Sequence, residues 1–72
     1  MAAKKWYYPL QKEVNKRLDK DYRQHNLNYQ DVCEDHVYEN YIVHTDTNVL
    51  CIQIVMSRLN NSFHVFEYVN EK

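Results

Sequence analysis

The sequence predicts a small α+β domain, with one or two N-terminal helices packed on a three-stranded antiparallel β-meander. Three observations support this fold class. Apolar residues recur every four positions between residues 9 and 24, which is typical of an amphipathic helix. Residues 37–69 instead alternate with a period of two and are rich in Val, Ile, Tyr and Phe, which is typical of strands. A chain of 72 residues has room for one domain, so residues 1–72 are expected to form a single unit.

The first predicted element is a helix from about Pro9 to Gln24, ending near His25–Asn26. Proline suits the first helical turn because its missing N–H needs no partner there. One face of this helix carries an apolar stripe, made of Leu10, Val14, Leu18 and Tyr22. The opposite face carries basic residues at about 100° per residue, namely Lys12, Lys16, Lys20 and Arg23. We expect the aromatic run at residues 6–8 to fix the start of the helix on the body of the domain.

A second, short helix is predicted from Tyr29 to His36, although a loop leading into a strand also fits this segment. Asn28 is a suitable N-cap residue. Leu27 and Val32 have the spacing of a hydrophobic staple on either side of it.

Three strands are predicted at Val37–His44, Val49–Ser57 and Phe63–Val69. Residues 45–48 and 60–61 separate them, and Asn can supply the positive φ of a tight turn in a chain without Gly. A two-residue turn at Asn60–Asn61 would pair Ile54 with Glu67. An even-length loop at 45–48 would pair Ile54 with Glu39 on its other side.

This register divides the side chains between two faces of the sheet. The predicted core face carries Val37, Glu39, Tyr41, Val43, Leu50, Ile52, Ile54, Met56, Phe63, Val65, Glu67 and Val69. The other face carries Tyr38, Asn40, Ile42, His44, Val49, Cys51, Gln53, Val55, Ser57, His64, Phe66 and Tyr68. An odd-length first turn would exchange the faces of the first strand alone.

Composition excludes several classes of protein. The absence of Gly rules out glycine-rich phosphate and dinucleotide loops. No apolar run reaches the ~20 residues of a membrane span, and residues 1–10 lack the apolar centre of a secretory signal, so we expect a cytoplasmic protein. Cys33 and Cys51 lack C-x-x-C spacing and are expected to be reduced, buried and apolar in character.

The sequence does not indicate an enzyme, a metal, a cofactor or a small-molecule substrate. Potential metal ligands are scattered, at His25, Cys33, His36 and His44, without a second matched pair. Ser57 and His64 are expected to be cross-strand neighbours, but the strained elbow of a nucleophilic serine is missing. Glu39 and Glu67 would share the core face, and we expect both to be solvated near its rim.

The charges suggest nucleic-acid binding as an alternative function. Residues 1–24 hold seven basic and three acidic residues, whereas residues 25–72 hold two basic and seven acidic residues. A nucleic acid would bind the basic helix face of Lys12, Lys16, Lys20 and Arg23. Acidic residues in the second part of the chain, and the lack of Lys or Arg beside the aromatic residues of the sheet, argue against it.

The preferred interpretation is a non-enzymatic protein-binding module, acting as a regulator, inhibitor or adaptor. One short helix cannot cover both faces of the sheet, so the second face is available to a partner. The predicted contact residues are Tyr38, Asn40, Ile42, Gln53, Val55, His64, Phe66 and Tyr68. A homodimer is preferred over a different protein partner. In its length and lack of catalytic motifs the chain resembles small accessory proteins of phages and mobile elements, many of which bind and block a host protein.

Overall fold

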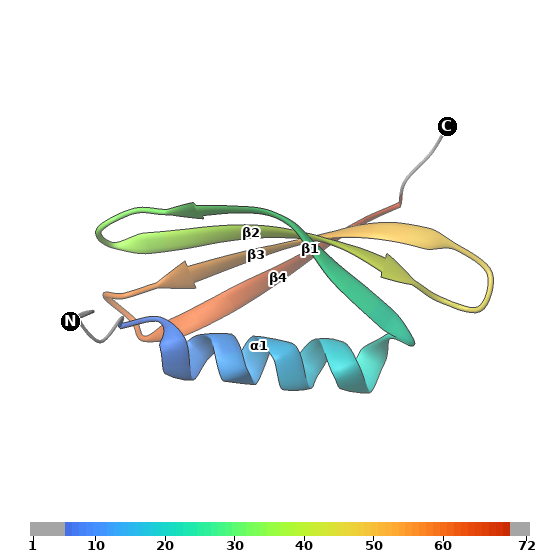
Figure 1. Cartoon of the computed structure of the whole chain (residues 1–72). Coiled ribbons are helices and arrows are strands. Elements are labelled where there is room, and N and C mark those ends of the chain that lie inside the picture. Colours follow the sequence, from blue (N-terminus) through green and yellow to red (C-terminus); the bar gives the residue numbers. More distant parts are fainter. Residues whose placement is uncertain (1–5, 70–72) are drawn as a thin grey trace.

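The computed structural model describes residues 6–69, which form one helix followed by a four-stranded antiparallel sheet. The elements are α1 (Tyr8–Asp21), β1 (Gln24–Val32), β2 (His36–His44), β3 (Val49–Ser57) and β4 (Ser62–Val69). The strands lie side by side in chain order. Helix α1 lies across one face of the sheet, and no other described element covers the opposite face (Figure 1). The predicted α+β fold is therefore confirmed, with four strands in place of three.

Helix α1 begins as predicted but ends earlier. Pro9 lies in its first turn, and Leu10, Val14 and Leu18 are buried along one side. The helix stops at Asp21, because Tyr22 is already extended (φ −134°, ψ 146°). The chain from Gln24 onward pairs with β2, and these inter-strand hydrogen bonds replace the predicted last turn of helix.

The predicted second helix is wrong, because the first half of that segment belongs to β1 and the rest forms the turn into β2. This strand pairs with β2 along its length, with a bulge between Leu27 and Tyr29. At the turn into β2 the backbone N–H of Cys33 donates to the carbonyl of His36 at 2.8 Å. An edge strand that is exposed on both faces has no need of alternating apolar residues, so the sequence carries no strand period here.

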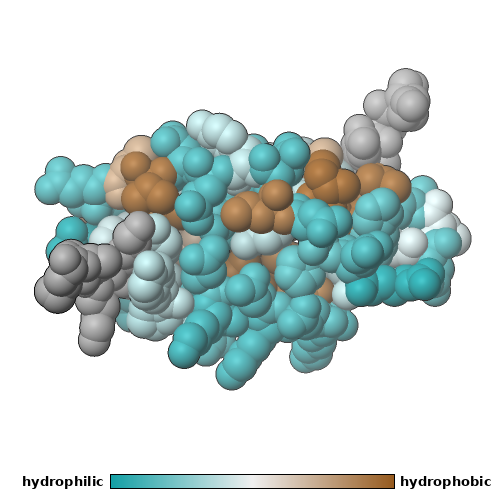
Figure 2. All heavy atoms as spheres, in the orientation of Figure 1, coloured by the Kyte–Doolittle hydropathy of each residue, from teal (hydrophilic) through white to brown (hydrophobic). Residues whose placement is uncertain are grey.

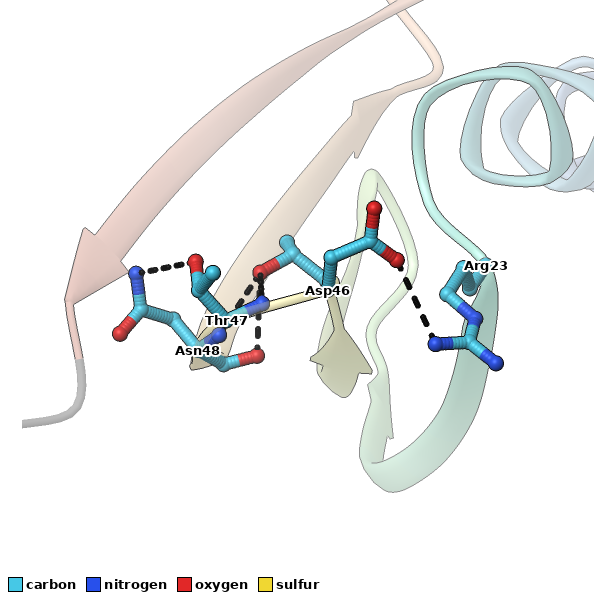
Figure 3. Close-up of polar contacts among 5 residues, drawn as sticks. Arg23, Asp46, Thr47 and Asn48 are labelled. Atoms are coloured by element: carbon cyan, nitrogen blue, oxygen red, sulfur yellow. Dashed lines mark hydrogen bonds and ion pairs between the residues drawn. The ribbon is translucent and has the colours of Figure 1, made fainter.

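The pairing of β2 with β3 is as predicted, with Glu39 opposite Ile54. Thr45 holds the loop between them without any Gly. Its Oγ1 accepts hydrogen bonds from the backbone N–H groups of Thr47 and Asn48, at 3.2 and 2.9 Å (Figure 3). The hydroxyl therefore closes the loop with a side-chain turn of the kind that Ser and Thr form.

The predicted pairing of β3 with β4 is wrong by two residues. Ile54 lies opposite Val65, not opposite Glu67, because the loop spans residues 58–61. Of these, Asn61 has a φ of 53°, in the left-handed region that Asn tolerates. A shift of two residues leaves every side chain on its predicted face.

The core lies between α1 and the sheet. Its buried apolar residues are Tyr7, Leu10, Val14, Leu18, Val37, Tyr41, Val43, Leu50, Ile52, Ile54 and Met56. Phe63 and Val65 of the edge strand β4 are half-buried, and Glu67 is exposed. The predicted core face is thus confirmed for β2 and β3. Cys33 was expected to be buried but is exposed at the β1–β2 turn, whereas Cys51 is half-buried.

Candidate interaction surface

The face of the sheet turned away from α1 is here called the open sheet face. Residues paired across antiparallel strands share a face, so the strand pairing defines its rows. The first row is Asp31, Tyr38, Val55 and His64; the middle row is Tyr29, Asn40, Gln53 and Phe66; the third row is Asn26, Ile42, Cys51 and Tyr68. All eight predicted contact residues lie in these three rows. The structure adds Asn26, Tyr29 and Asp31 from β1, which sequence reasoning missed because it placed most of this segment in a helix.

Aromatic rings are exposed across the open sheet face. Tyr29 and Tyr68 are each 53% exposed, Phe66 is 43% exposed and Tyr38 is 36% exposed. The imidazole of His36 stacks on the ring of Tyr38, with centroids 6.0 Å apart and planes at 14°. Large rings of low conformational entropy are the side chains most enriched in protein interfaces.

Charge is nearly absent from this surface. At the strand positions that the structure describes, the open sheet face carries no Lys or Arg, and Asp31 is its one carboxylate. Asn40 and Gln53 sit together at its centre, between the rings of Tyr29 and Phe66 in the middle row. Side-chain amides both donate and accept hydrogen bonds, so this centre can be hydrated when free and satisfied by a partner when covered.

The two layers of the molecule differ in character. Figure 2 shows hydrophobic side chains along the sheet layer, whereas the outer surface of the helix layer below it is hydrophilic. The sheet layer is therefore the better surface for an apolar partner.

The basic face of α1 is smaller than predicted. Lys12, Lys16 and Lys20 are exposed along the helix, in agreement with the prediction. Arg23 is not part of this face, because the helix has ended before it. Its guanidinium instead lies 3.3 Å from the carboxylate of Asp46 in the β2–β3 loop (Figure 3).

Glu39 was expected to be solvated and is instead completely buried beneath α1. Its Oε2 accepts hydrogen bonds from Nε2 of both Gln11 and Gln30, each at 2.7 Å. Its Oε1 accepts one from the hydroxyl of Tyr41, also at 2.7 Å. Burial and the hydrogen bond to Glu39 raise the pKa of Tyr41 well above its usual range. This network joins the helix to β1 and β2, and it faces the core and not a cleft.

The other residues considered for catalysis do not come together in a site. Ser57 lies opposite Ser62, and His64 lies opposite Val55, so Ser57 and His64 are not the direct pair that was expected. Glu67 is exposed, and the hydroxyl of Tyr22 lies 3.4 Å from its carboxylate. Burial and this neighbouring carboxylate raise the pKa of Tyr22.

Residues 6–69 contain neither a cluster of metal ligands nor a membrane-spanning helix. No three His, Cys, Asp or Glu side chains in this range lie close enough together to hold a metal ion. Nor does this range contain a helix with the length and apolar character needed to cross a membrane.

A groove of about 430 Å³ lies where the β1–β2 and β3–β4 turns meet. It is lined by Asp35, His36, Arg58 and Leu59. Leu59 is 90% exposed, so one wall of the groove is itself surrounded by solvent. Small-molecule sites usually bury most of their ligand, and this groove lacks that enclosure.

Comparison of the chain with protein families, curated proteins and solved structures finds no match. The open sheet face and its chemistry are therefore what indicates a function for this chain.

Proposed function

We propose that this chain is a non-enzymatic protein-binding module that uses the open sheet face as its contact surface. The observation that carries the proposal is the set of exposed rings on that face, in a setting without Lys or Arg at the described strand positions. Small monomers seldom leave such a surface exposed without using it. A module of this kind acts as a regulator, an inhibitor or an adaptor, according to what it covers. We place it in the cytoplasm, where Cys33 and Cys51 would remain free thiols.

The energetics of the surface support a binding role. Covering the exposed part of Phe66, Tyr38 and Tyr68 removes apolar area from water, at roughly 25 cal/mol per Å². Aromatic side chains have only two rotatable bonds, so little side-chain entropy is lost when a partner covers them. Asn40 and Gln53 then supply the polar contacts that orient a partner.

The test is the double substitution Tyr38→Asp and Phe66→Asp. Both side chains are partly exposed, so the variant is expected to keep its circular dichroism spectrum. It should lose self-association in sedimentation and lose any protein that co-purifies with the unaltered chain. Leu59→Asp is the matched control, because Leu59 is exposed but lies in the β3–β4 loop away from the strand rows.

Two results would contradict this proposal. A folded double variant that keeps every partner contradicts it. If the double variant unfolds, Phe66→Asn alone repeats the measurement with a milder change, and retention of all partners by that variant has the same meaning.

Nucleic-acid binding is the second candidate, and one observation favours it. Lys12, Lys16 and Lys20 lie at four-residue spacing on the exposed side of α1. Against it, Asp19 and Asp21 lie on the same helix, and Arg17 is paired with Asp21 at 3.1 Å. These carboxylates carry the same sign of charge as phosphate, so they weaken the attraction of the lysines for it.

A further inference from the structure

We propose that the occupant of the open sheet face is a second copy of this chain, related to the first by a two-fold axis parallel to the strands. The axis passes over the boundary between β2 and β3. This inference rests on the proposed use of the open sheet face, and it specifies both the partner and the orientation.

The strand order determines what such an axis brings together. A half-turn about a line that runs along the strands exchanges β1 with β4 and β2 with β3. Each row of side chains stays at its own level along the strands. A residue at one end of a row therefore faces the residue at the other end of the same row in the second copy.

In the first row, this operation places Asp31 opposite His64 of the second copy, and His64 opposite the second copy's Asp31. Asp31 is the one carboxylate on the described part of the face, and it meets a side chain that can donate a hydrogen bond and carry a positive charge. The pair forms twice, once on each side of the axis.

The middle row is also complementary to itself under the same operation. Tyr29 faces Phe66 of the second copy, so ring covers ring at both ends of the row. Asn40 faces Gln53 of the second copy, and the two amides supply one another with donors and acceptors. No charge is buried without a partner in this arrangement.

An axis across the strands is less favourable. A half-turn about the middle row would place Asp31 opposite Asn26 and His64 opposite Tyr68 of the second copy. The carboxylate would then lose its imidazole partner. Charge complementarity therefore selects the axis along the strands.

The size of the face is sufficient for such a dimer. Four strands at ~4.8 Å spacing and about 28 Å in length give a footprint of roughly 550 Å² on each copy. The total of about 1,100 Å² exceeds the ~1,000 Å² that a specific interface needs and falls just short of the ~1,200 Å² at which the standard size class begins. Stacked sheets cross at about 30°, which displaces the edge strands by only about 4 Å, within reach of the Asp and His side chains.

The test uses two single variants, Asp31→Lys and His64→Glu. In Asp31→Lys, the lysine of each copy faces His64 of the other copy, so both contacts lose their carboxylate. In His64→Glu, the glutamate of each copy faces Asp31 of the other copy, so both contacts bring two carboxylates together. Each variant alone should self-associate at least about tenfold more weakly than the unaltered chain in sedimentation equilibrium. Mixed in equal amounts, the two variants should form a heterodimer of nearly unaltered affinity, because both contacts become complementary. Asp31 and His64 of one copy are three strand spacings apart, about 14 Å, so rescue within one molecule is excluded.

The outcomes separate this inference from the proposed function. If the unaltered chain remains a monomer while Phe66→Asp abolishes binding of a different protein, the second copy is wrong and the protein-binding role stands. A dimer that requires Phe66 but gives no heterodimer in the mixture contradicts the axis. A dimer that survives Phe66→Asp forms elsewhere on the molecule and contradicts this inference, and it contradicts the proposed function as well when the variant also retains every other partner.

Discussion

Glu39 is fully buried beneath α1, and its carboxylate accepts short hydrogen bonds from Gln11, Gln30 and Tyr41. A buried charge is costly unless donors replace the water that it has lost. Here one donor comes from the helix, one from the edge strand and one from the same strand as the carboxylate. The network therefore favours one placement of α1 over the sheet, because any other would leave the carboxylate without the donor from Gln11.

Substitution of Glu39 by Gln is predicted to destabilise the domain by about 1–3 kcal/mol. The neutral amide keeps the size of the side chain but has one accepting oxygen in place of two, and it lacks the charge that strengthens the hydrogen bonds to the carboxylate. Urea unfolding measures the loss. The control is Glu67→Gln, a change at an exposed carboxylate that should alter stability by less than about 0.5 kcal/mol. Equal effects at the two positions would mean that the network adds nothing.

Tyr41 predicts a loss of stability at alkaline pH. Burial and the hydrogen bond to Glu39 raise its pKa, so the folded protein keeps this proton to higher pH than the unfolded chain does. The contribution is complete below the ordinary Tyr pKa near 10 and declines as pH rises beyond that value. Stability measured by urea unfolding should therefore fall between about pH 10 and 12.

Tyr41→Phe is the control for this effect. The variant lacks the ionisable hydroxyl, so it should start less stable at neutral pH but lose less of its stability over the alkaline range. Parallel curves for the two proteins would assign the alkaline loss to other groups.

The sequence placed Glu39 on the core face but did not reveal its burial. The alternation along β2 is visible in the sequence, and it orients Glu39 correctly. Its partners Gln11 and Gln30 lie 28 and 9 residues away, and polar residues at such separations carry no periodic signal. The expected solvation was wrong for this reason.

The sequence predicted β2 and β3 but not β1, and the difference between them is burial on one face. β2 and β3 alternate strictly between buried and less buried positions, and their predicted bounds are within one residue of those observed. β1 is exposed almost throughout, so its sequence lacks this alternation. Its apolar residues have helical spacing, but this spacing was misleading. A strand that is not buried in the core is under no constraint to show either a helical or an alternating period.

Packing of α1 on the sheet is tested by Leu18→Ala. Leu18 is fully buried, and truncating a buried leucine usually costs about 2–5 kcal/mol. Thermal or urea unfolding should show a loss of this size, which is a large part of the stability of so small a domain. Leu59→Ala removes the same atoms from a side chain that is 90% exposed, and it should cost less than about 0.5 kcal/mol. A similar loss in both variants would place the core elsewhere.

The lysines of α1 give a prediction for the alternative function. If they bind phosphate, affinity for single- or double-stranded DNA should fall with salt, with a log–log slope of roughly 0.7–0.9 per contact. Replacing Lys12, Lys16 and Lys20 with Gln should then abolish binding while the helix content is unchanged, because all three are exposed. Absence of binding at low salt in the unaltered chain ends this alternative.

In the molecule as a whole, the open sheet face exists because the described chain has fewer helices than sheet faces to cover. One helix of 14 residues covers one side of a four-stranded sheet, and residues 6–69 contain no second helix for the other side. The sequence predicted this uncovered face and eight of its residues from strand period and loop parity alone. It missed the contribution of β1, and with it Asp31 and Tyr29, because membership of an edge strand is decided by pairing with β2.

The order of the strands also has a consequence for the time course of folding. Each strand pairs with its neighbour in the chain, so most of the sheet forms by closing short loops. The surface beneath α1 is complete only when β1 and β4, which both contact the helix, are in place. Chains dominated by such near-neighbour pairings fold fast, and we expect one refolding phase on the order of milliseconds. Trp6 packs at the margin of the core and reports this step in stopped-flow fluorescence. A dominant phase of seconds would show that docking of the helix, and not closure of the hairpins, limits the rate.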